Sequence, residues 1–240
     1  MKIAILSDIH SNFQALKRVL SEIYDIDAIW ALGDIVGYGP SPMECLHLIK
    51  EKADIVLCGN HDLAVSGGLP SFNFNRYAQA ALEYTKKIMD RKGLDYLSGL
   101  KPFGTINGIT LTHGSPADPA SGYILNPESA NRAKAALTGT YCFFGHTHQP
   151  GIFAYKKGKF HWITLKEEES APLNEENIFF NPGSVGQPRD NDPRASYAIV
   201  DMEKKTWTQK RSEYDIKTVQ KKMRGLGSPD FLINRIARGI

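Results

Sequence analysis

Residues 2–23, KIAILSDIHSNFQALKRVLSEI, decide the fold. Residues 2–7 are an apolar run, which predicts a buried β-strand, and residues 11–23 carry apolar side chains at intervals of three and four, which predicts an amphipathic helix. Ser11 or Asn12 is the expected N-cap, because a short polar side chain at that position accepts a hydrogen bond from a free backbone N–H of the first turn. A strand that runs directly into a helix indicates the start of an α/β sheet.

The same alternation continues outward from this stretch. Further strands are expected at 28–32, 53–58 and 108–114, and further helices at 41–52 and 74–90. The resulting βαβαβ order predicts a parallel sheet with right-handed crossover connections.

From about residue 141 the pattern changes to strands joined by short turns. These strands are expected at 140–145, 151–155, 160–165, 177–182, 195–202 and 206–214. They predict a second, largely antiparallel sheet that packs against the first. The charged segment KEEESAPLNEE, residues 166–176, is expected to be a solvated loop.

Length and composition favour one α/β domain over residues 1–240, because 240 residues with 42% hydrophobic side chains can form one large core. The three cysteines are odd in number and far apart, so we interpret them as buried small hydrophobes in a reducing compartment. The opening MKIAIL does not resemble a signal peptide, and no apolar run reaches the roughly 20 residues that span a bilayer. A soluble cytoplasmic protein with no membrane partner is expected.

The formal net charge of +3 is uneven along the chain. Residues 201–240 hold ten Lys or Arg against five Asp or Glu, a balance of +5, which leaves −2 for residues 1–200. The basic residues near the end fall at helical spacing, so a basic helical segment is expected at about 215–240. We interpret it as a solvated helix face, because a nucleic-acid site usually shows denser clustering, and a nucleic-acid partner is disfavoured.

Polar residues gather at the ends of the predicted strands. They are Asp8, His10, Asp34, Asn60, His61, Asp62, His113, His146 and His148. Each alone has a plain structural interpretation as a turn, cap or packed residue. Together they meet at the carboxyl edge of a sheet, where α/β proteins bind ligands, and a metal would satisfy so many desolvated polar groups.

Spacing adds detail to this metal hypothesis. Residues i and i+2 of an extended segment point the same way, about 6 to 7 Å apart, so His146 and His148 could each bind a different ion of a pair. The same geometry would let Asp8 and His10 share one ion. Imidazole, carboxylate and amide ligands without cysteine suit transition metals, so Mn or Fe is the first expectation, with Zn, Ni or Co as alternatives.

The ordered motifs D-x-H, G-D, G-N-H-D, H-G and G-H-T-H, over residues 8–148, resemble those of the calcineurin-like metallophosphoesterase superfamily. The segment NPGSVGQPRD, residues 181–190, extends the resemblance to a small prokaryotic branch of phosphodiesterase-like proteins. The resemblance implies a four-layer αββα sandwich, in which helices flank two mixed β-sheets, and a dinuclear metal site.

Carried over position by position, the resemblance divides the ligands between two ions. One ion would be held by Asp8, His10, Asp34 and His148. The other would be held by Asp34, Asn60, His113 and His146, with Asp34 as the bridge. His61 matches the family's histidine that faces the leaving group.

Two divalent ions outweigh the charges of Asp8, Asp34 and a bridging hydroxide, so the expected substrate is a small anionic, phosphorylated molecule. Metal coordination lowers the pKa of bound water toward about 7, which predicts attack of hydroxide on phosphorus without a covalent phosphoenzyme. A protonated His61 would donate a proton to the departing oxygen. Its alternative role is packing beside the metals.

The second motif departs from that of serine/threonine protein phosphatases, which carry GDxVDRG. Gly37 and Tyr38 stand where that motif has Asp and Arg, so protein phosphatase activity is disfavoured. Asp62 is the substitute candidate for orienting His61. Arg189 is the replacement candidate for gripping phosphate, because a guanidinium can donate two parallel hydrogen bonds, and a loop-bracing role is its alternative.

Loops 67–77 and 114–126 are expected to border the site and to offer Arg76 and Tyr123 to the substrate, together with Tyr38. Aromatic rings near a phosphate site can stack on a nucleobase, which makes a nucleotide or dinucleoside polyphosphate a hypothesis. A non-catalytic metal-binding scaffold and a nuclease are the alternative functions. The sequence leaves open the physiological substrate, the preference between monoesters and diesters, and the oligomeric state.

Overall fold

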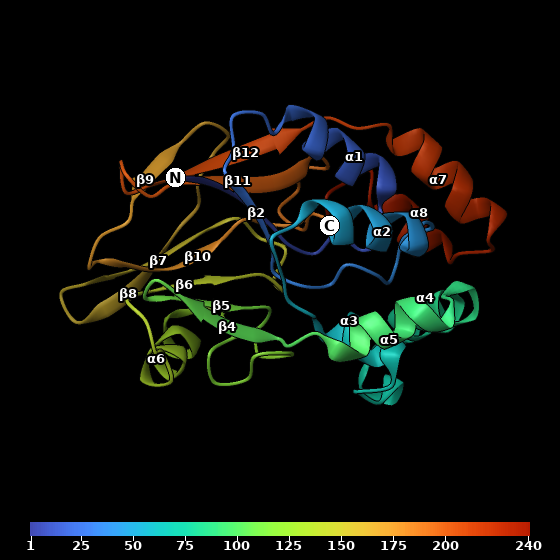
Figure 1. Cartoon of the computed structure of the whole chain (residues 1–240), viewed down its shortest axis with the longest axis horizontal. Coiled ribbons are helices and arrows are strands. Elements are labelled where there is room, and N and C mark those ends of the chain that lie inside the picture. The colour runs from blue at the N-terminus through green and yellow to red at the C-terminus, as the bar shows by residue number, and fades with distance from the viewer.

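The computed structural model describes residues 1–240, apart from the side chain of Asn177. Two six-stranded sheets lie face to face, with helices outside them (Figure 1). In the first sheet the strand order is β3 (Ile55–Val56), β2 (Ala28–Ala31), β1 (Lys2–Leu6), β11 (Ala195–Asp201), β12 (Thr206–Ser212) and β9 (Ser170–Pro172). In the second it is β4 (Phe103–Ile106), β5 (Ile109–Thr112), β6 (Tyr141–Phe144), β10 (Asn177–Asn181), β7 (Gly151–Lys156) and β8 (Lys159–Ile163).

Both sheets are mixed. Strands β1, β2 and β3 are parallel, whereas β1 pairs antiparallel with β11, in register from Lys2 opposite Asp201. In the second sheet β5, β6 and β10 are parallel, and β4, β7 and β8 are antiparallel to their neighbours.

The sequence pattern predicted that the second sheet begins at about residue 141, and this prediction is wrong. Strands β9, β11 and β12 return to the first sheet, and β5 belongs to the second. The reason is burial, because β11 is apolar on both faces and occupies a central position beside β1. The expected loop 166–176 contains β9, a short edge strand.

Eight α-helices surround the sheets in the described chain. They are α1 (Phe13–Glu22), α2 (Pro42–Lys52), α3 (Asn60–Ser66), α4 (Arg76–Ile88), α5 (Arg91–Gly99), α6 (Pro127–Ala135), α7 (Ile216–Gly225) and α8 (Asp230–Arg235), with a 3₁₀ turn, η1, at Ser71–Asn73. Helices α1 and α2 lie outside the first sheet, and α6 lies outside the second (Figure 1). The predicted αββα sandwich of two mixed sheets is therefore confirmed.

The N-terminal stretch folds as its sequence predicts. Asn12 is the N-cap of α1, and its side chain accepts a hydrogen bond from the backbone N–H of Ala15 at 3.1 Å. Ala15, Leu16 and Val19 form the buried stripe of the helix. Burial of this stripe against the sheet fixes where β1 ends, and hence where Asp8 and His10 lie.

The main core lies between the two sheets. The rings of Phe143, Phe180 and Trp207 are buried there, and the Phe143 and Trp207 centroids are 5.0 Å apart. The three cysteines are free and buried, as predicted. Within the described residues, no helix combines the length and the apolar character that a membrane span requires.

The C-terminal segment is not only a solvated basic face. Val219 of α7 and Leu232 and Ile233 of α8 are buried in a cluster with Tyr38 and α4. This packing places α8 beside the site that the strand ends form.

Candidate metal centre

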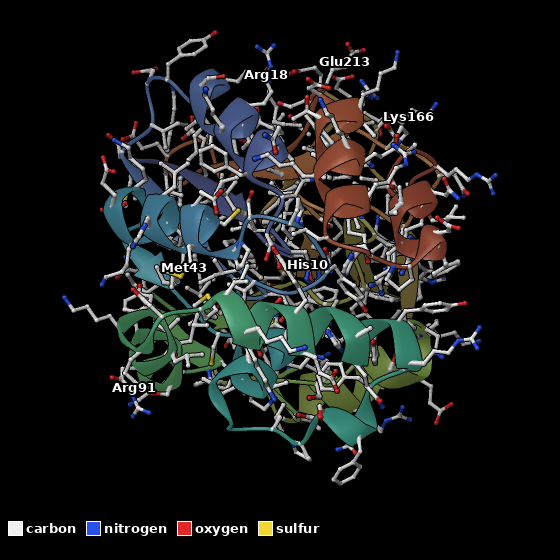
Figure 2. All side chains as sticks on the ribbon, turned by 90° about the vertical axis from the view of Figure 1, so that its right-hand side faces the viewer. His10, Arg18, Met43, Arg91, Lys166 and Glu213 are labelled. Atoms are coloured by element: carbon white, nitrogen blue, oxygen red, sulfur yellow. The ribbon has the colours of Figure 1, made fainter. Side chains whose placement is uncertain are left out.

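The strand ends of both sheets converge on one buried centre. Asp8 and His10 follow β1, Asp34 follows β2, and Asn60 begins α3 after β3. From the second sheet come His113 after β5, and His146 and His148 after β6. None of these seven side chains is more than 9% exposed. Figure 2 shows His10 in the middle of the molecule, between the green helices and the orange C-terminal helices.

The first cluster holds Asp8, His10 and His148. The Nε2 atoms of the two histidines are 3.1 Å apart, and Asp8 Oδ1 lies 3.2 Å from His148 Nε2. The opposite nitrogens face backbone carbonyls, with His10 Nδ1 at 3.3 Å from Val36 O and His148 Nδ1 at 2.5 Å from Gln187 O. A carbonyl only accepts hydrogen bonds, so each Nδ1 carries the proton and the two Nε2 lone pairs face each other.

The second cluster holds Asp34, His113 and His146 and repeats this arrangement. His113 Nε2 lies 3.2 Å from His146 Nδ1. Their other nitrogens donate to carbonyls, His113 Nδ1 to Leu32 O at 3.0 Å and His146 Nε2 to Ser121 O at 3.1 Å. Here too, two ring nitrogens that do not face a carbonyl point into the same space.

Asp34 lies between the two clusters. Its Oδ2 is 3.6 Å from His10 Nε2 and 3.4 Å from His113 Nε2, while its Oδ1 accepts a hydrogen bond from the backbone N–H of His61 at 2.9 Å. A third group, His10, Asp34 and His61, shares two of its members with the other clusters.

The donor atoms fit two divalent transition metal ions. Asp8 Oδ1 and Asn60 Oδ1 are buried without a hydrogen-bond partner, which is costly for a polar oxygen. Facing lone pairs 3.1 to 3.2 Å apart repel each other unless a positive charge lies between them. Imidazole nitrogens with carboxylate and amide oxygens are ligands that such ions accept.

The pKa directions agree with a cation site. Burial raises the pKa of Asp34, but its interactions with His113 and His61 outweigh burial. The pKa of Asp34 therefore lies well below its usual range, and the side chain stays anionic. Burial lowers the pKa of His146 to about 3, so its imidazole is neutral, the form that binds metals. His113 differs, because burial lowers its pKa but Asp34 outweighs burial and raises it to about 9. In the metal-free chain His113 therefore carries a second proton, which a bound metal would replace beside Asp34.

Five of the seven predicted ligands have left-handed backbone, with φ between 46° and 64°. They are Asp8, His10, Asp34, His146 and His148. The expected extended geometry is therefore wrong for Asp8–His10 and His146–His148, although Asp8 and His10 do share a cluster and His146 and His148 do divide between two. A non-glycine residue in this conformation costs about 1 to 3 kcal/mol, and such strain concentrates at functional sites.

His61 lies beside the centre, 4% exposed, with its ring 4.8 Å from that of His10 and 4.5 Å from that of Tyr38. A Cβ on Gly37 would lie 2.5 Å from His61 Nδ1, so only glycine allows this close approach. Burial, aided by the charge of Arg189, lowers the pKa of His61 to about 4. The imidazole is therefore neutral, which corrects the expectation of a protonated donor.

Asp62 does not orient His61, contrary to our expectation. Its carboxylate accepts hydrogen bonds from the backbone N–H groups of Ile35, Val36 and Gly59 at 3.0 to 3.1 Å, so both oxygens are occupied. Burial, followed by the charge of Asp34, raises the pKa of Asp62 to about 7. Its observed task is to hold the loop after β2 against the start of α3.

A cavity of about 650 Å³ opens onto the centre. It is lined by three predicted substrate-contact residues, Tyr38, Tyr123 and Arg189. Arg76 is a correction, because it is exposed, lies outside the described lining, and donates from Nη2 to the Tyr77 hydroxyl at 2.7 Å.

Sequence reasoning did not single out other residues of this lining. Phe74 and Tyr77 lie in loop 67–77, which was expected to border the site, whereas Phe231 and Arg235 were not expected there. The last two belong to the C-terminal segment, whose helical spacing was visible but whose docking beside Tyr38 was not. No local signal in the sequence points to that contact.

The comparisons with known proteins identify the family. The profile of the calcineurin-like phosphoesterase superfamily domain matches residues 1–205, and the chain belongs to this superfamily. It is a metallophosphoesterase, a hydrolase of phosphate esters. A metallophosphoesterase from Sphaerobacter thermophilus has the same fold, with a TM-score of 0.91 and 40% identity over 100% of this chain and 99% of that one.

Three curated relatives add to this picture. The uncharacterized protein MJ0912 of Methanocaldococcus jannaschii is 36% identical over 99% of this chain and 98% of its own length. Phosphodiesterase YfcE of Escherichia coli is 27% identical over 84% of this chain and 88% of its own. A symmetrical bis(5'-nucleosyl)-tetraphosphatase of Baumannia cicadellinicola is 37% identical, but over only 26% of this chain and 24% of its own.

Proposed function

We propose that this chain is a dinuclear phosphoesterase that hydrolyses small phosphodiesters or nucleotide-type esters. The observation that carries the proposal is the pair of facing imidazoles in each cluster, with Asp34 Oδ2 between them. Asp8, His10, Asp34 and His148 would hold one ion, and Asp34, Asn60, His113 and His146 the other. Mn or Fe is the first choice and Zn, Ni or Co the alternatives, because the donor set lacks thiolate.

When bound, the two ions would lower the pKa of a water molecule and withdraw charge from the phosphoryl oxygens. The chain supplies the rest of the chemistry. The backbone N–H of His61 fixes Asp34 through Oδ1, which leaves Oδ2 for the centre, and the backbone N–H of His146 fixes Asp8 in the same way. His61 lines the cavity, and its neutral ring has one N–H to donate to the departing oxygen.

The cavity supports a small substrate. Its volume of about 650 Å³ lies within the range of small-molecule sites, and aromatic rings form part of its wall. The names phosphodiesterase and nucleosyl-tetraphosphatase among the relatives support diester and nucleotide substrates. A nuclease would need a broader basic groove for a polymer, and nothing in the described lining favours one.

The test is hydrolysis of bis-p-nitrophenyl phosphate by metal-stripped protein refilled with Mn²⁺, with p-nitrophenyl phosphate run in parallel. We expect metal-dependent cleavage of the diester, and little or none by the chelated protein. Two bound ions per chain without hydrolysis of either ester would contradict the proposal and favour the non-catalytic scaffold.

A further inference from the structure

Two arginines in the cavity have no Asp or Glu side chain as a partner. Arg189 and Arg235 both line it, and neither pairs with a carboxylate side chain in the described part of the chain. Other arginines of the same region are neutralised, because Arg194 pairs with Asp192 at 2.7 Å and Arg211 pairs with Asp190. A guanidinium in a cavity without a carboxylate partner indicates a site for an anionic ligand.

Arg189 is held rigidly at the edge of the metal centre. Its backbone N–H donates to the carbonyl of His148 at 3.2 Å, and its Nη2 donates to Gln187 Oε1 at 2.9 Å. Its Cζ lies 5.9 Å from the ring centroid of Tyr38, and its Nε is buried without a hydrogen-bond partner. A buried N–H without a partner is costly, so the Nε–H of Arg189, in the residue that hydrogen-bonds the backbone of His148, is available to donate to a ligand.

Arg235 approaches the same place from α8. Its Cζ lies 5.1 Å from the ring centroid of Phe231, and its Nε donates to Ile240 O at 2.5 Å. Arg235 lines the cavity, and its two Nη groups make no hydrogen bond among the described residues. Burial lowers the pKa of Arg235 to about 10, and the positive charge of Arg189 acts in the same direction. Tyr38 lines the same cavity as both arginines, with its ring centroid 5.9 Å from Arg189 Cζ.

We propose that Arg189 and Arg235 together bind a second phosphate of the substrate, so that the substrate carries at least two phosphate groups. This inference rests on the proposed function, because the phosphate to be cleaved is assigned to the metal centre. Asp34 is the only carboxylate in the described lining, and its oxygens are directed at His61 and the two clusters. A phosphate suits a pair of guanidiniums, since each can donate two parallel hydrogen bonds to its oxygens.

One of the two arginines, Arg235, comes from the C-terminal segment. Residue 205 ends the family match, so Phe231 and Arg235 lie outside it. Helix α8 is anchored by Leu232 and Ile233, both 2% exposed or less, next to α7 (Figure 1). Phe231 also stacks on Tyr77, with centroids 4.7 Å apart, which adds apolar surface at the rim for the organic part of the substrate.

The first test measures binding without turnover. Pyrophosphate is titrated into the metal-stripped protein in an isothermal titration calorimeter. The Kd should be at least about tenfold higher for Arg235→Gln and for Arg189→Gln than for the wild type. Arg238→Gln is the matched control, because Arg238 is an exposed arginine three positions further along and lies outside the described lining. Equal affinities of the wild type and Arg235→Gln would overturn the inference.

The second test measures selectivity in the Mn²⁺-loaded protein. Arg235→Gln should lower the ratio of kcat/KM for diadenosine tetraphosphate to kcat/KM for bis-p-nitrophenyl phosphate at least about tenfold, mainly through KM, and Arg235→Lys should lower it less. An equal loss on both substrates, at an unchanged melting temperature, would contradict the inference. A wild type that hydrolyses neither compound would remove the proposed function, whereas pyrophosphate binding would still decide the role of the arginine pair.

Discussion

At the scale of single residues, Asp34 is the side chain on which both clusters depend. Its Oδ2 lies within 3.6 Å of a histidine nitrogen from each cluster. Asp34→Asn removes the negative charge and can present an amide nitrogen there, so we expect the variant to retain less than about one tenth of the wild-type Mn²⁺ at both sites. Metal content after gel filtration, measured by plasma mass spectrometry, gives the result.

Asp95→Asn is the control for this prediction, because Asp95 is half exposed and pairs with Arg91 on α5, away from the centre. It should bind as much metal as the wild type. Two ions per chain in Asp34→Asn would contradict the assignment of Asp34 as the bridge.

Substitution of His61 should affect turnover but not metal binding. Its ring borders the cavity, whereas its hydrogen bond to Asp34 comes from its backbone N–H. His61→Ala should therefore keep both metals and lower kcat at least about tenfold, with the greatest loss for poor leaving groups, because they depend most on a donated hydrogen bond. Rates on an alkyl and an aryl diester would be compared, and unchanged rates on the alkyl diester would remove His61 from the mechanism.

At the scale of the elements, α3 is fastened through Asp62. The carboxylate accepts three buried backbone N–H groups from two separate loops. Asp62→Ala leaves all three without a partner, so we expect the free energy of unfolding of the metal-free protein to fall by at least about 2 kcal/mol, measured by urea denaturation.

Asp90→Ala provides the comparison for this prediction. Asp90 caps α5 at an exposed position and accepts one N–H, from Gly93 at 2.7 Å, so its loss should cost only about 1 kcal/mol. If Asp62→Asn lowered turnover as much as His61→Ala at unchanged stability, Asp62 would have the catalytic role that its contacts do not support.

The sequence predicts those elements whose pattern is local. Apolar periodicity predicted β1 and α1, and polar residues just after strands predicted the residues of the candidate metal clusters, because a strand end sets the position of the next few residues. The partners of a strand are not local, so the sequence did not reveal that β11 lies beside β1. The same limit explains Arg235, whose place depends on α8 docking near Tyr38.

At the scale of the whole molecule, the candidate metal centre lies where the two sheets meet. Asp8 and His10 extend from the first sheet and His148 from the second, so one ion would cross-link strands that are far apart in the chain. Without a cation, this junction contains facing lone pairs and an unpartnered buried carboxylate oxygen. Metal removal should therefore weaken the contact between the two halves of the sandwich.

This linkage predicts a large metal dependence of stability. An ion that binds only the folded chain, at about 100 times its Kd, adds about 2.7 kcal/mol, and in a chain of this size each kcal/mol raises Tm by roughly 2 to 4 °C. The Mn²⁺-loaded wild type should therefore unfold at least about 5 °C above the chelated protein in differential scanning calorimetry, and Asp95→Asn should behave alike. Asp34→Asn should lose most of this increase, because both clusters share its carboxylate. Equal melting temperatures of the loaded and chelated wild type would show that the centre does not join the sheets through bound metal.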